Sequence, residues 1–471
     1  MFILTDDLAW NLVKKRYMPH VVDLRRRGTT FNRYIVADSL CCPSRSSIFT
    51  GLFPHDSGVS GNAGKDGGYG AFQRHRDQYK TYAVAIRPRG YRTAMLGKYL
   101  NGYGAQKMTR AIPPGWSDWT GAGDAYAEFN YDLNENGRIV HYGGPPPPPA
   151  RAANYLTDVL ASRATRVINQ AARAHRPFVM EVATFAPHRP YTPAPRNAHD
   201  FRGLKAPRNR AFDRNNFDPP LWLGIRPPLT QKQIHSINRA FRKRAQSAES
   251  VDRMIGRLEA TLRARHLANN TYIFFSSDNG YHMGEHRLLP GKQTAFDTDI
   301  RVPLIVTGPG VPHNRVDPQL VQNVDLNPTF AELAGAPAQP SVDGHSIVPL
   351  LHPPRSRRAP FPWRTAALIE HRGPDTYVSD PDLENGRLSG NPTTYRAIRL
   401  AGGPFGDAVY VEYDDPASER EFYDIDADPN QRFNIYYTGL PVTTRLQLHA
   451  MAVALASCHG ASACWAAGEP H

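Results

Sequence analysis

The clearest β-strand in this 471-residue sequence is Thr271-Tyr272-Ile273-Phe274-Phe275-Ser276-Ser277, which runs into the polar pair Asp278-Asn279. A short run of aromatic and β-branched residues is typical of a buried strand. It follows a long helical pattern over residues 231–265, whose apolar residues repeat on one face: Val251, Ile255, Leu258 and Leu262. A helix that leads directly into a buried strand is the first indication of a layered α/β fold.

The same alternation extends through most of the chain. Strand patterns are found at 2–5, 91–98, 177–183 and 302–306, and helical patterns at 9–27, 44–50 and 158–174. This alternation predicts an α/β fold with a large, mostly parallel central sheet and helices on both faces. Residues 104–150, which end in a run of prolines at 145–149, are predicted to be irregular.

The pattern changes after about residue 350. Short strands with an antiparallel character are expected at 395–400, 408–413 and 421–423, followed by a helix over 443–456. We therefore predict two domains, a catalytic domain over 1–350 and a small C-terminal α+β domain with an antiparallel sheet over 351–471.

Composition excludes some classes of protein. No apolar run approaches the roughly 20 residues that a membrane span needs, so no membrane span is expected. The net charge is +13, which suits a polyanionic partner such as a sulfated glycan or simply reflects a compositional bias. Nucleic acid is not an expected partner, because the basic residues are dispersed and no dense Lys/Arg tract with interleaved aromatics occurs.

The four cysteines form two groups, of which Cys458 and Cys464 lie close together near the C-terminus. A disulfide between them would indicate an extracellular, secretory or periplasmic compartment. Two free thiols are the alternative, and a zinc site is disfavoured because only His459 stands close enough to help. No signal peptide is visible before residue 2, which is compatible with a trimmed mature form, a fragment or a late-assigned start.

Polar residues follow several of the predicted strands. Asp6-Asp7, Lys98, His188 and Asp278-Asn279 each come after a strand, and such residues gather at the carboxyl edge of an open α/β sheet. The carboxylate and amide oxygens suit Ca²⁺ or Mg²⁺. Alone, either aspartate of the first pair could cap a helix and Asn279-Gly280 could form a tight turn.

A resemblance to a known family joins these features. Cys41-Cys42-Pro43-Ser44-Arg45 resembles the signature Cys-x-Pro-Ser-Arg of the sulfatases, in which the first cysteine is oxidised to Cα-formylglycine. Further segments are similar to that family, and the lysine motif in particular to its N-acetylglucosamine-6-sulfatase and arylsulfatase branch: Leu4-Thr5-Asp6-Asp7, Gly97-Lys98-Tyr99-Leu100-Asn101, Ala186-Pro187-His188, Ser277-Asp278-Asn279-Gly280 and Gly291-Lys292. The similarity spans nearly the whole chain and implies the alkaline-phosphatase-like fold.

The resemblance implies a role for each matched residue. Ca²⁺, or alternatively Mg²⁺, would be held by Asp6, Asp7, Asp278 and Asn279, together with an oxygen of the modified Cys41. Arg45 would stabilise the hydrated aldehyde, Lys98 and Lys292 would bind the sulfate oxygens, and His188 would protonate the leaving oxygen.

One position departs from the family pattern. Many arylsulfatases have a histidine two residues after the lysine, where this sequence has Leu100. In the family that histidine helps to turn over the intermediate, so either Asn101 or another histidine, such as His282, compensates for it, or this branch solves the step differently. Asn101 and His282 are also candidate substrate contacts, and His282 and His286 could each equally be an ordinary loop residue.

The sequence thus predicts a sulfuric ester hydrolase that cleaves sugar or aryl O-sulfates, with a leaning towards N-acetylglucosamine 6-sulfate. Its expected partners are a sulfated small molecule or glycan and a formylglycine-generating enzyme or other maturase. The alternatives are a phosphonate or phosphate monoester hydrolase of the same superfamily and a non-catalytic sulfated-glycan-binding protein.

Overall fold

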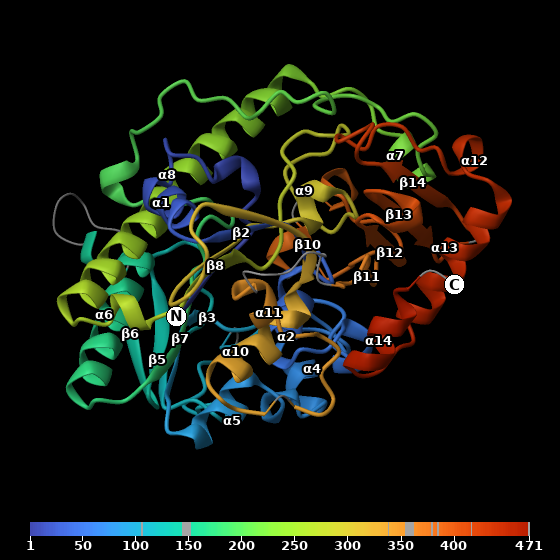
Figure 1. The fold of residues 1–471 in the computed structure, drawn as a ribbon. Helices are drawn as coiled ribbons and strands as arrows, with labels where there is room; N and C mark the ends of the chain where they lie inside the picture. The colour runs from blue at the N-terminus through green and yellow to red at the C-terminus, as the bar shows by residue number, and fades with distance from the viewer. Residues whose placement is uncertain are drawn as a thin grey trace.

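The computed structural model describes residues 1–104, 107–143, 152–337, 339–353, 362–377, 380–383, 386–415 and 417–469. Its main feature is a ten-stranded sheet in the order β10-β2-β9-β8-β1-β7-β3-β4-β5-β6 (Figure 1). The strands are β1 Phe2–Thr5, β2 Thr29–Ile35, β3 Arg92–Lys98, β4 Asp118–Ala122, β5 Tyr131–Glu135, β6 Arg138–Tyr142, β7 Phe178–Ala183, β8 Ile273–Ser277, β9 Leu304–Thr307 and β10 Arg315–Gln322. The neighbours from β8 to β4 pair in parallel, whereas β9 and β5 run antiparallel to theirs. The predicted α/β fold with a mostly parallel sheet is confirmed.

Helices cover both faces of this sheet. Strand β1 shows why, because Phe2 and Leu4 belong to one apolar core and Ile3 to the other. On the first face lie α2 Cys41–Thr50, α4 Gly68–Arg74, α5 Tyr82–Ile86 and α10 Leu326–Leu333, and on the second α1 Pro19–Arg26, α6 Leu156–Arg173 and α8 Gln231–Ala264. Shorter helices are α3 Pro54–Ser57, α7 Leu221–Gly224, α9 Asp297–Ile300 and α11 Val348–Leu351. A strand buried on both faces must be largely apolar, as Phe2, Ile3 and Leu4 of β1 are.

A second, four-stranded antiparallel sheet lies after residue 350, as predicted. It contains β11 Ala366–His371, β12 Tyr395–Leu400, β13 Ala408–Tyr413 and β14 Arg420–Asp424 in sequential order. Helices α12 Tyr436–Gly439, α13 Val442–Leu455 and α14 Ala461–Ala467 follow it. Cys458 and Cys464 form the predicted disulfide. The domain boundary at residue 350 stays a prediction.

Several local predictions were wrong. The helix expected over 9–27 is a 3-10 turn, Trp10–Leu12, and then α1, which starts at Pro19 because proline suits the first helical turn. Helix α2 begins at Cys41 rather than at residue 44. The segment 104–150 is not irregular throughout, since it contains β4, β5 and β6, and its proline run lies outside the described residues. Within the described residues, no helix is long and apolar enough to cross a bilayer.

Candidate active site

The carboxyl ends of four adjacent strands form the floor of a buried polar site. Strands β8, β1, β7 and β3 are neighbours in the sheet. Asp278-Asn279, Asp6-Asp7 and His188 follow the first three, and Lys98 is the last residue of β3. Gly97 lets β3 end close to β7, because a Cβ there would lie 1.9 Å from the carbonyl oxygen of Ala183. The sheet therefore gathers residues that are up to 273 positions apart, as the sequence predicted.

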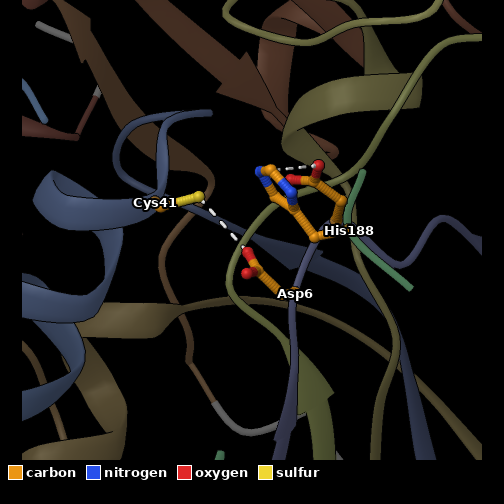
Figure 2. Close-up of side chains that lie close together, drawn as sticks. Asp6, Cys41 and His188 are labelled. Atoms are coloured by element: carbon orange, nitrogen blue, oxygen red, sulfur yellow. Dashed lines mark hydrogen bonds and ion pairs between the residues drawn. The ribbon is translucent and has the colours of Figure 1, made fainter. Parts of the chain in front are cut away.

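Cys41 enters this site from the first residue of α2, so its side chain lies at the helix N-terminus (Figure 2). Its thiol donates a hydrogen bond to Oδ1 of Asp6 at 3.3 Å and accepts one from Nζ of Lys292 at 2.8 Å. Burial, with a contribution from Asp6, raises the pKa of the thiol well above its usual value. The neighbouring Cys42 belongs instead to an apolar core, and burial raises the pKa of its thiol to about 12. The Cys41 thiol thus contacts two charged side chains directly.

Two side-chain oxygens in this site have no hydrogen-bond partner within the described residues. Oδ2 of Asp7 and Oδ1 of Asn279 are buried and have no hydrogen-bond partner among the residues that the structure describes. Asn279 is oriented by its amide nitrogen, which donates to Oδ1 of Asp7 at 2.7 Å. Ligand atoms of Asp6, Asp7, Cys41 and His188 all lie within 4.8 Å of one another. Orphaned oxygens beside clustered carboxylates fit a hard divalent cation such as Ca²⁺.

Three buried cations balance the carboxylates. Lys98 Nζ lies 2.6 Å from Asp6, Lys292 Nζ lies 2.6 Å from Asp7, and Arg45 Nε donates to Asp278 at 2.8 Å.

These ion pairs shift the pKa values of the groups that they join. Burial alone would raise the pKa of Asp6, but the charges of Lys98, His188 and Arg45 outweigh it and lower this pKa. Burial would likewise lower the pKa values of both lysines, yet the facing carboxylates hold them well above their usual range. The lysines are therefore cationic in the site.

His188 presents its Nε2 atom to the site. Its Nδ1 donates a hydrogen bond to the carbonyl oxygen of Arg189 at 2.7 Å. Its Nε2 lies 3.6 Å from Asp7, and the ring packs on Tyr126 with 4.5 Å between centroids. Burial would lower the pKa of this histidine, but Asp7 and Asp6 outweigh it and raise the pKa. An imidazolium that presents Nε2 is suited to donate a proton.

Sequence reasoning missed Asp382, which lies in the 3-10 turn Pro381–Leu383. Its Oδ1 lies 2.8 Å from Nε2 of His188 and 3.0 Å from Nζ of Lys292, and its Oδ2 accepts from Asn62 at 2.7 Å. No strand end or motif marks this aspartate in the sequence. Tyr126 was missed for the same reason, although its ring lies 4.9 Å from Lys98 Nζ.

The candidates for substrate binding separate into two groups. Asn101 adjoins the site, since its amide donates to the hydroxyl of Tyr126 at 3.3 Å. His282 lies off the cluster and pairs with Asp299 at 2.9 Å, and its Nε2 has no partner among the described residues. His286 stacks on Phe296, and burial lowers its pKa to about 3. Leu100 is buried in an apolar core.

A buried cysteine at a helix start, carboxylates with orphaned oxygens and three cations define an anion-processing site on an alkaline-phosphatase-like sheet. The family profile described as Sulfatase matches residues 1–336. The N-acetylglucosamine-6-sulfatase of Homo sapiens is 35% identical over 429 residues, which cover 87% of this chain and 76% of that protein. The chain therefore belongs to the sulfatase family and is a sulfuric ester hydrolase.

Solved structures share the fold. One, described as a complex with its substrate D-glucosamine-2-N,6-O-disulfate, has a TM-score of 0.78 at 21% identity and covers 96% of both chains. The phosphonate monoester hydrolase of Silicibacter pomeroyi has a TM-score of 0.66 at 20% identity and covers 95% of this chain and 92% of that one. The predicted family and fold are thus confirmed.

Proposed function

We propose that this protein hydrolyses O-sulfate esters of sugars, of the N-acetylglucosamine 6-sulfate type, with a formylglycine made from Cys41 and a bound Ca²⁺. The observation that carries the proposal is the position of Cys41, whose sulfur lies between Asp6 and Lys292 at the start of α2. An acceptor on one side and a cation on the other suit a group that must lose a proton as it reacts.

The proposed conversion of Cys41 requires a maturase, a formylglycine-generating enzyme or another, as a partner. The environment fits the product, because Asp6 can accept a hydrogen bond from a hydroxyl and Lys292 can donate one. The hydrated aldehyde would supply the nucleophilic hydroxyl for attack on sulfur and a second hydroxyl for the later release of sulfate. An unmodified thiol in this place has neither, and burial keeps it protonated.

Asp6, Asp7, Asp278 and Asn279 would hold Ca²⁺, with an oxygen of the modified residue. The two orphaned oxygens of Asp7 and Asn279 support this assignment. The ion would supply positive charge next to the sulfate ester. Arg45 holds Asp278 in place through Nε and donates through Nη1 to the carbonyl oxygen of Lys98 at 2.9 Å, so one side chain links two strand ends.

The chain's own cations would bind the substrate and move its proton. Lys98 and Lys292 would bind the sulfate oxygens, since charge-assisted hydrogen bonds in a site without bulk water strengthen the binding of an anion. His188 would hold a proton on Nε2 and deliver it to the leaving alcohol oxygen. Asn101 and His282 remain proposed contacts for the rest of the substrate.

Asp382 has a part in this proposal. Its carboxylate pairs with His188 and Lys292, two of the groups assigned to the sulfate ester. Two anions cannot share these contacts without repulsion, so Asp382 is displaced when the substrate binds. The free site thus keeps its cations paired until an anion arrives.

The compartment is part of the proposal as well. A disulfide near the C-terminus supports an extracellular, secretory or periplasmic location, where such bonds persist. The human relative, named for N-acetylglucosamine 6-sulfate, supports the substrate class.

The test combines a mass measurement with a sulfate-release assay. Protein coproduced with a maturase should yield a peptide in which Cys41 carries the aldehyde, and it should release sulfate from N-acetylglucosamine 6-sulfate. Cys41→Ala should abolish release, whereas Cys42→Ala, a matched buried thiol one residue away, should retain it. Full activity with an intact Cys41 thiol would refute the mechanism.

The same assay separates the alternatives. Faster turnover of an aryl phosphonate or phosphate than of the matching aryl sulfate would favour the phosphonate or phosphate monoester hydrolase. Saturable binding of sulfated glycans without release of sulfate, in fully matured protein, would favour a glycan-binding protein.

A further inference from the structure

A second group of metal-ligating side chains lies away from the Cys41 site, where the C-terminal disulfide loop meets the catalytic part of the chain. His55 and Asp56 belong to α3, which follows the signature helix α2, and His459 lies inside the loop closed by Cys458 and Cys464. One ligand atom from each of the three residues lies within 4.8 Å of the other two. Residues 403 positions apart therefore converge on one point.

Both histidines face the carboxylate of Asp56. Nδ1 of His459 contacts Oδ1 of Asp56, and Nε2 of His55 lies 3.9 Å from Oδ2 of Asp56. Two imidazole nitrogens and one carboxylate oxygen are a usual donor set for Zn²⁺ and similar transition-metal ions, and they differ from the all-oxygen set that suits Ca²⁺.

His55 is also oriented as metal-bound histidines are. Its Nδ1 lies 2.8 Å from Oε2 of Glu370, on β11, so this nitrogen donates outward and Nε2 faces the cluster. A carboxylate behind a ligating histidine fixes its tautomer and increases its basicity as a ligand. Nε2 donates a hydrogen bond to the carbonyl oxygen of Cys458 at 2.8 Å, so a bound ion would displace the Nε2 proton and would have this carbonyl oxygen close by as a further ligand.

A rigid support holds the two segments together. One carboxylate oxygen of Asp343 accepts from the backbone nitrogen of Phe53 at 2.7 Å, and the other accepts from that of Gly460 at 2.8 Å. Phe53 directly precedes α3, and Gly460 follows His459. Because both segments are tied to one buried carboxylate, the ligand atoms are brought together without an ion.

An ion can reach this cluster from solvent. The side chains of His55 and Asp56 are 16% and 14% exposed, whereas that of His459 is 73% exposed. The site thus has two ordered ligands on a helix and one accessible ligand on a disulfide-closed loop.

We propose that His55, Asp56 and His459 bind a divalent transition-metal ion such as Zn²⁺, which fastens the disulfide loop to α3. The carbonyl oxygen of Cys458 or a water would complete four ligands. The expectation that only His459 could assist a zinc site near Cys458 and Cys464 is thereby revised. Cys458 and Cys464 form the disulfide and so are not ligands, and the ligands besides His459 come from α3. This site is independent of the proposed sulfatase mechanism.

The test uses the full chain with excess Ca²⁺, so that the oxygen-rich site is filled. Calorimetric titration with ZnCl₂ should give one saturable site per chain, and Zn²⁺ should raise the thermal midpoint. His459→Ala, a change at an exposed side chain, should remove both effects and leave sulfate release unchanged. Glu370→Gln should weaken Zn²⁺ binding by about 10- to 100-fold, as for other carboxylates behind a metal-bound histidine.

His141→Ala is the matched control. His141 also pairs with an aspartate, Asp132, through Nδ1 at 2.8 Å and is 61% exposed, but it belongs to no three-ligand group within the described residues. It should bind Zn²⁺ as the unaltered protein does. Absence of a saturable Zn²⁺ site in the unaltered protein, or the same Zn²⁺ affinity in His459→Ala, would overturn the proposal.

Discussion

Asn279→Ala tests the proposed Ca²⁺ site at its neutral ligand. The side-chain oxygen Oδ1 of Asn279 is buried and has no hydrogen-bond partner in the part of the chain that the structure describes. The amide nitrogen donates to Asp7 at 2.7 Å and to the carbonyl oxygen of Gly280 at 2.8 Å. Alanine removes a ligand and also releases Asp7 from a hydrogen bond that orients it. Both changes should weaken Ca²⁺ binding without altering the charge of the site.

The size of the effect follows from the contacts. A hydrogen bond to a charged group contributes roughly 1.5–3 kcal/mol. Losses of this size correspond to a Kd for Ca²⁺ raised about 10- to 150-fold, because each 1.4 kcal/mol is about a factor of ten. At a Ca²⁺ concentration about 100 times the original Kd, binding stabilises the fold by about 2.7 kcal/mol. With a Kd raised about 30-fold, this stabilisation falls to about 0.9 kcal/mol.

The assay measures the thermal midpoint and the rate of sulfate release while Ca²⁺ is varied. Asn327→Ala is the matched control, since Asn327 is also fully buried and donates to the backbone carbonyl of Phe49, and its Oδ1 has no hydrogen-bond partner among the described residues. It should lower stability equally with and without Ca²⁺. Asn279→Asp, which keeps an oxygen at this place, should recover part of the Ca²⁺ response.

An unchanged Ca²⁺ dependence in Asn279→Ala would refute the reasoning. It would mean that the orphaned oxygens of this site do not face the ion. Equal losses in Asn279→Ala and Asn327→Ala would show a general effect on packing instead.

Three further predictions concern other residues. Asp382→Asn should lower KM for the sulfate ester about tenfold in steady-state kinetics, with kcat changed little, because one charge-assisted hydrogen bond no longer opposes binding. A raised KM would contradict the displacement of the Asp382 carboxylate by the substrate. In denaturant titration, the double variant Cys458→Ser, Cys464→Ser should have a free energy of unfolding lower by about 2.4 kcal/mol. This is the loop-closure entropy that a disulfide removes from the unfolded chain for a loop of about seven residues. Burial raises the pKa of Glu128 to about 8, although Thr157 donates to it. Its contribution to stability is therefore complete below its unfolded pKa of about 4.5 and is lost as the pH rises through about 8. Glu128→Gln should thus gain stability relative to the unaltered protein between about pH 5 and 9 in thermal melts, and a constant difference would contradict this.

Much of the fold was predictable, because β1, β3, β7 and β8 are largely buried and so carry short apolar runs. The strands that were missed are of another kind. In β10, Pro318 and a shift of register between Asp317 and Leu320 interrupt the alternation, which an edge strand tolerates.

The residues proposed for catalysis were predictable where a strand end or a family motif marked them. Asp382 had neither mark and lies far along the chain, so only the folded structure brings it to His188. The partner of His459 was hidden for the same reason, because Asp56 lies on α3, far from His459 in the sequence.

The central position of β1 has a consequence for the order of folding. The strand Phe2–Thr5 precedes both of its neighbours in the chain, since β7 and β8 end at residues 183 and 277. The pocket around Cys41 therefore cannot close until the chain has been synthesised through residue 277. In the folded protein Cys41 has 0% exposure, out of reach of another enzyme. The proposed maturase must therefore act on the growing or unfolded chain. Because β8 is synthesised after β1 and β7, Cys41 stays accessible to that enzyme until then.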